Sequence, residues 1–144
     1  MNCFLSKIKP VLVIVTVILS AGFCFSAMNP EINITHYEYG KIIVNDKNYL
    51  KDIVIWPDGT ITDGPEDMHS LSLADFDELF NSGLKKVLFG TGNEGKAGWD
   101  FRSKLKKEIK NRGIELIIMD THEAVKFLNN SKERDFLAYV HLNC

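Results

Sequence analysis

A glycine-rich segment directly after a short apolar run is the part of this chain best suited to chemistry. Val87-Leu88-Phe89 is typical of a buried strand, and it passes without a spacer into Gly90-x-Gly92-x-x-Gly95. Glycines at the end of a strand expose backbone amides, which are the groups that bind phosphates and other anions in α/β proteins. The candidate ligand-binding residues are Gly90, Thr91, Gly92, Asn93, Glu94, Gly95 and the nearby Trp99.

The glycine pattern also matches the dinucleotide fingerprint, with Asp120 after the next strand where a ribose-binding acid would lie. Two details argue against that cofactor. A dinucleotide site opens its helix within the glycines, whereas the next helix here is expected to begin near Asp100. Asp100 and Glu94 would also place carboxylates where a pyrophosphate belongs. We expect no cofactor. Two interpretations of the loop remain. It is either a site for another small ligand or anion or a purely structural turn, and we favour the structural turn.

The histidines and the last cysteine are the other residues with metal-binding or nucleophilic chemistry. His69, His122, His141 and Cys144 lack the short paired spacing of a zinc motif. His141 and Cys144 are three residues apart, so a strand would place them on opposite faces. We therefore predict no metal site and no catalytic residue.

The first 27 residues differ from the rest of the chain. Lys7 and Lys9 precede an apolar stretch over 11–25, and no acidic residue occurs before Glu31. A basic end, a short apolar segment and small residues are typical of a secretory leader. We expect residues 1–27 to be cleaved, which leaves an exported domain over 28–144. The alternative is that residues 11–27 remain as a membrane anchor, and this segment would then be the domain's only membrane contact.

Composition and charge restrict the partners of the remaining domain. The chain has 144 residues and a formal net charge of −2, and the leader carries two lysines and no acids, so the domain has −2 − 2 = −4. A mildly acidic domain without a basic stripe argues against nucleic acid. Cys3 and Cys24 lie in the leader, so Cys144 remains as a single thiol. An inert thiol is the favoured interpretation, and an intermolecular disulfide that makes a homodimer is the alternative.

The pattern of the domain predicts strands first and then β-α-β-α-β. Residues 31–63 are expected to form strands, with turns over Asn45–Asn48 and Pro57–Gly59, and with 49–56 as one extended segment. A helix is expected from a capping box at Ser72 and Asp75 to Gly83. Strands over 87–89, 114–119 and 136–142 then alternate with a helix over 100–112 and a shorter one capped by Thr121. This order predicts an α/β fold with a mixed central sheet flanked by about three helices.

Several short motifs follow one another along the domain, and they include Tyr39-Gly40, Ile55-Trp-Pro-Asp-Gly59, Val87–Gly92, Gly113-Ile-Glu115, Thr121-x-Glu-Ala-Val125 and the closing His141-Leu-Asn-Cys144. Taken in this order, they resemble the Mth-type domain family, whose biochemistry is largely unassigned. The family includes the adipogenesis-associated Mth domain protein and the respiratory complex I assembly factor three. The resemblance covers about residues 35–144. It implies the same mixed-sheet fold and a glycine loop that lines a surface cleft, and it brings no catalytic residues.

The family resemblance and the missing catalytic constellation together favour one class of function. We expect an exported or membrane-tethered, non-catalytic interaction or assembly module that binds a protein partner. The alternative is a ligand-binding domain or enzyme that works through residues 90–99.

Overall fold

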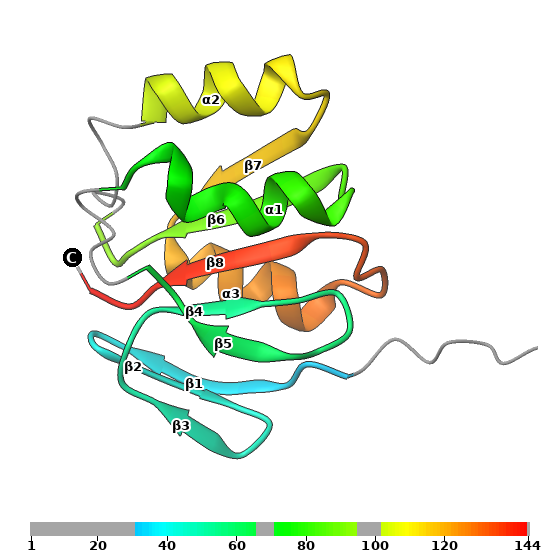
Figure 1. Cartoon of the computed structure of the whole chain (residues 1–144). Helices are drawn as coiled ribbons and strands as arrows, with labels where there is room; N and C mark the ends of the chain where they lie inside the picture. The colour runs from blue at the N-terminus through cyan, green and yellow to red at the C-terminus, as the bar shows by residue number, and fades with distance from the viewer. Residues whose placement is uncertain (1–30, 66–70, 95–101, 144) are drawn as a thin grey trace, which may run out of the picture.

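The computed structural model describes residues 31–65, 71–94 and 102–143 of the chain. Five strands form a mixed sheet in the order β5-β4-β8-β6-β7, and a separate antiparallel sheet has the order β1-β2-β3. The predicted α/β fold with a mixed central sheet and three helices is confirmed (Figure 1). The strands are β1 (Ile34–Glu38), β2 (Lys41–Val44), β3 (Lys47–Tyr49), β4 (Ile53–Ile55), β5 (Ile61–Asp63), β6 (Lys86–Thr91), β7 (Glu115–Met119) and β8 (Leu137–His141).

The large sheet separates two hydrophobic cores. On one face it packs against α1 (Asp77–Ser82), which follows a 3-10 turn over Leu73–Phe76, and against α2 (Arg102–Asn111). On the other face it packs against α3 (Thr121–Asn130) and the small three-stranded sheet. Figure 1 shows α1 and α2 at one side and the small sheet with α3 at the other. The domain therefore has one central layer that is covered on both faces.

The N-terminal hairpins differ from the prediction in two places. The turn between β2 and β3 uses only Asn45 and Asp46, at φ 49° and 62°, and Lys47 already pairs with Val44. Two left-handed residues make the tight hairpin turn that Asn and Asp accept. The predicted extended segment 49–56 is also wrong, because the chain leaves the small sheet after Tyr49 and enters the large one at Ile53.

The first helix follows its predicted signals. Asp75 Oδ2 accepts hydrogen bonds from the Ser72 amide at 2.6 Å and from its hydroxyl at 2.8 Å. Gly83 ends α1 in the left-handed region, at φ 76°, where a glycine carries no steric cost. Leu105 and Ile109 form the buried stripe of α2, as predicted, while the expected cap Asp100 lies outside the described residues.

Candidate functional site

The carboxyl ends of three parallel strands lie together at one end of the large sheet. β8 and β7 both run parallel to β6, on its two sides. The chain leaves β6 toward α2 on one face and leaves β7 toward α3 on the other. Adjacent strands whose connections depart to opposite faces create the crevice where open α/β sheets bind ligands. The residues that follow β6, β7 and β8 are therefore the candidate site.

Gly90 and Thr91 belong to β6, so the strand extends two residues beyond the predicted 87–89. A methyl group on Gly90 would lie 3.2 Å from Ala124 Cβ and 3.2 Å from Thr121 Oγ1, both on α3. These distances are shorter than ordinary contacts, because α3 crosses directly over the strand. The first glycine of the pattern thus permits close helix–strand packing.

The hydroxyl of Thr121 joins the ends of two strands to α3. Its Oγ1 donates to the His141 carbonyl at 2.7 Å and accepts from the Gly92 amide at 2.9 Å. The Thr121 amide donates to the Gly92 carbonyl at 3.0 Å. Gly92 has φ 87°, so it occupies the left-handed region. The Gly92 amide, which the sequence offered as an anion donor, is held by a protein hydroxyl.

Thr121 does not cap α3, contrary to the prediction. The N-cap is Asp120, whose Oδ1 accepts from the Glu123 amide at 2.9 Å. The dinucleotide pattern would have placed Asp120 as a ribose-binding acid. In this structure its carboxylate instead caps the N-terminus of α3.

Of the remaining described loop residues, Asn93 contacts α3. The Asn93 Oδ1 atom is 2.7 Å from His122 Nε2, and the Tyr37 ring packs edge-on to His122 with centroids 4.8 Å apart. Asn93 and Glu94 are both exposed. Gly95 and Trp99 lie outside the described residues. Ligand binding by the loop stays a prediction.

A buried carboxylate–imidazole pair lies at the end of β8. His141 Nδ1 is 2.7 Å from Asp52 Oδ2, and the two side chains are 3% and 10% exposed. Asp52 Oδ1 also accepts from the Leu142 amide at 2.8 Å. An aspartate that orients a histidine is a component of nucleophilic catalysis. Here both oxygens of the aspartate also fix the end of β8 to the segment that joins the two sheets.

Asp52 also lines a surface cleft of about 450 Å³, together with Leu50, Lys51, Asp63, Gly64, Pro65 and Asn143. No local sequence pattern predicts this pair, since Asp52 and His141 are 89 residues apart. Of the four residues considered as metal ligands, the structure describes His122 and His141. No group of three metal-ligating side chains occurs in the described part of the chain. Cys144 and His69 fall outside it.

The hydrophobic core between the large sheet and α1 contains a buried tyrosine. Tyr139 on β8 packs against Phe76 with ring centroids 4.9 Å apart, and its hydroxyl donates to the Asp75 carbonyl at 3.3 Å. Burial, followed by the nearby charges of Glu78 and Asp75, raises the pKa of Tyr139 well above its ordinary value. The phenol therefore keeps its proton at neutral pH and joins β8 to the 3-10 turn that precedes α1.

The segment 11–27 is not part of the described structure, and no helix within 31–65, 71–94 or 102–143 has the length and apolar character of a membrane span.

Solved structures share this fold. A conserved hypothetical protein from Pyrococcus horikoshii is 26% identical, with a TM-score of 0.63, over 78% of this chain and 99% of that one. A Bartonella henselae protein described as an outer membrane protein is 18% identical, with a TM-score of 0.61, over 81% and 99%. A Bordetella pertussis protein described as a Mth938-like domain is 18% identical, with a TM-score of 0.51, over 82% and 88%.

No protein of curated function matches the sequence. The family model described as a protein of unknown function, DUF498/DUF598, matches residues 34–141. That match takes in all eight strands and all three α-helices of the described residues. The chain therefore belongs to the DUF498/DUF598 family.

Proposed function

We propose that this domain is a non-catalytic interaction module that is exported, or tethered to the membrane by residues 11–27, and that assembles with a protein partner through β7. The observation that carries the proposal is the open edge of this strand. β7 is an edge strand of the large sheet, and it pairs only with β6 in the described part of the chain. Its sequence is Glu115-Leu-Ile-Ile-Met119, and its four apolar side chains are all partly exposed.

The backbone of β7 offers regularly spaced hydrogen-bonding groups along this edge. The Glu115 amide donates to the Lys85 carbonyl at 2.7 Å, so it points toward β6. Because successive amides of a strand alternate in direction, those of Leu116 and Ile118 point to the outer edge. Proteins usually protect such edges with charges, prolines or a covering element. An extended segment of a partner would satisfy these groups by strand addition.

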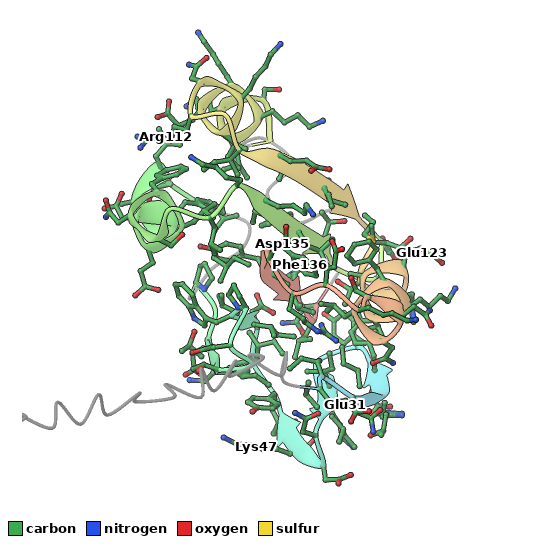
Figure 2. All side chains as sticks on the ribbon, turned by 90° about the vertical axis from the view of Figure 1, so that its right-hand side faces the viewer. Glu31, Lys47, Arg112, Glu123, Asp135 and Phe136 are labelled. Atoms are coloured by element: carbon green, nitrogen blue, oxygen red, sulfur yellow. The ribbon has the colours of Figure 1, made fainter. Side chains whose placement is uncertain are left out.

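The surface next to β7 indicates the chemistry of that partner. A groove of about 440 Å³ lies between α2 and β7, and Lys106 and Lys110 on α2 line it with Ile114, Glu115 and Leu116. Both lysines are exposed, and in Figure 2 the side chains of α2 extend outward at the top of the molecule. An extended apolar segment with acidic side chains beside it would complement this groove.

Site-specific photo-crosslinking in the native compartment tests the proposal. A photoreactive residue at Glu115 should give a discrete adduct with one protein, whereas the same residue at Lys47, on the edge strand of the small sheet, should not. The double change Lys106→Glu and Lys110→Glu should reduce that adduct at least about fivefold. The matched control is Lys104→Glu with Lys107→Glu, which makes the same charge change on α2 away from the groove. Equal adducts from both strands, or equal loss in both double variants, would reject β7 as the interface.

The crosslinked band also gives the partner's identity by mass spectrometry, and a second copy of this chain is one of its readable outcomes. The intact mass of the protein recovered from the same cells gives the fate of residues 1–27. A loss of about 3 kDa, from about 27 residues at roughly 110 Da each, marks cleavage, and an unchanged mass marks the retained anchor.

A further inference from the structure

Arg134 is a buried cation, and no salt bridge joins it to an acid among the residues that the structure describes. It is 8% exposed, and its Nη2 donates to the carbonyls of Leu128, at 2.7 Å, and Ile32, at 3.4 Å. Its Nη1 is buried and has no hydrogen-bond partner within the described residues. A guanidinium stays protonated in proteins, and a buried charge is costly unless it is compensated. Burial also lowers the pKa of Arg134, as expected for a charge without a counter-ion.

A polar pocket lies next to this guanidinium. It has a volume of about 320 Å³, and Arg134 forms part of its wall with Asn33, Asn129, Ser131, Lys132 and Glu31. Two cations and one carboxylate line it, so the pocket is positive in a domain that is acidic as a whole. The neighbouring carboxylate of Asp135 does not compensate Arg134, because it is paired with Lys86 at 3.2 Å.

We propose that this pocket binds a phosphate group. Lys132 and the side-chain amide of Asn33 supply donors, whereas the Asn33 backbone amide donates to Asn45 Oδ1 at 2.8 Å and the Ser131 hydroxyl donates to the Glu133 carbonyl at 3.1 Å. Arg134 is part of the wall, but its Nη1 is shielded by protein atoms, so its charge acts on the pocket without direct contact through this atom. Charges separated by protein rather than water interact strongly, so an anion in the pocket lowers the cost of the buried guanidinium.

The phosphate has two chemical sources. One is a free phosphate or phosphate ester, and the other is a phospholipid headgroup. The chain enters β1 at the same side of the molecule where α3 joins β8 (Figure 1), and Glu31, labelled in Figure 2, lies at this entry. A membrane-retained segment over 11–27 would hold this pocket close to lipid headgroups, whereas the cleaved protein would meet free phosphates.

An NMR titration with inorganic phosphate tests the proposal on protein recovered from cells that express the full chain. Saturable shifts are expected at the amides of Asn33 and Ser131. Lys132→Gln should raise the dissociation constant for phosphate about tenfold, which corresponds to the loss of one charge-assisted hydrogen bond. Lys132 is exposed, so this variant keeps the fold. The matched control Lys47→Gln, which changes an exposed lysine outside the pocket, should leave the constant unchanged.

Co-sedimentation with vesicles separates the sources. Preference for phosphatidylglycerol over phosphatidylcholine that Lys132→Gln removes, without a response to free phosphate, identifies the headgroup. A response to free phosphate without vesicle preference identifies the soluble anion. The proposal is overturned if neither probe binds, or if Lys132→Gln and Lys47→Gln have the same effect.

Discussion

Thr121→Val tests whether one hydroxyl holds the candidate site together. Valine has nearly the shape of threonine, and residue 121 is fully buried, so the substitution removes the hydroxyl without opening a cavity. The change removes the acceptor of the Gly92 amide, at 2.9 Å, and the donor to the His141 carbonyl, at 2.7 Å. The perturbation is therefore confined to the junction of β6, β8 and α3.

The expected loss follows from the two buried groups that are left behind. An unsatisfied buried donor or acceptor costs about 1–3 kcal/mol, and the added methyl group returns about 1 kcal/mol. With two such groups, we expect Thr121→Val to lower the free energy of unfolding by about 1–5 kcal/mol. That is a large share of the roughly 5–15 kcal/mol that stabilises an ordinary domain.

Urea unfolding at 25 °C measures this loss, and Thr35→Val is the control. Thr35 lies exposed on β1, so the same chemical change there should stay within about 0.5 kcal/mol. Hydrogen exchange gives a local readout, because the Gly92 amide should exchange faster in Thr121→Val. If both variants lose the same small free energy and the Gly92 amide stays protected, the hydroxyl does not have the role that we assign to it.

Three further predictions concern the same part of the fold. Gly90→Ala should cost about 1–3 kcal/mol because its methyl meets Ala124 Cβ at 3.2 Å; adding Ala124→Gly should recover part of this, and strictly additive losses in a double-mutant cycle would contradict the contact. Asp52→Ala should cost about 2–6 kcal/mol, because His141 Nδ1 and the Leu142 amide both lose their partner and each such group costs about 1–3 kcal/mol, and Asp52→Asn should cost clearly less in the same urea assay; equal losses would argue against the pair. The raised pKa of Tyr139 means that the native state holds the phenolic proton more tightly than the unfolded chain, so this stabilisation is complete below about pH 10 and is lost as pH rises toward the folded pKa; Tyr139→Phe should make stability fall less steeply above pH 10, and an unchanged slope would refute the assignment.

Local signals predicted most of the architecture. The capping box at Ser72, the turn at Pro57–Gly59 and the stop at Gly83 each depend on residues that are close in sequence, and the structure has all three. The alternation of apolar strands and amphipathic helices likewise predicted the mixed sheet. The break between Tyr49 and Ile53 was missed, because a strand pattern does not say to which sheet a segment belongs.

The candidate site was less accessible to sequence reasoning, because its contacts are long-range. The contact between Asp52 and His141 depends on the pairing of β4 with β8, and no local sequence pattern predicts that pairing. The role of Gly90 depends on where α3 crosses β6, which spacing alone does not give. Thr121 was predicted as a cap from its position before a helix, although Asp120 immediately before it fills that role.

The position of β8 has a consequence for how the domain is made. β8 lies between β4 and β6, so it bridges the earlier hairpin β4–β5 to the later pair β6–β7. A ribosome delivers this bridging strand after all the others, and until then the two halves of the large sheet have no direct pairing. The large sheet can therefore complete its pairing only after residues 137–141 have left the ribosome.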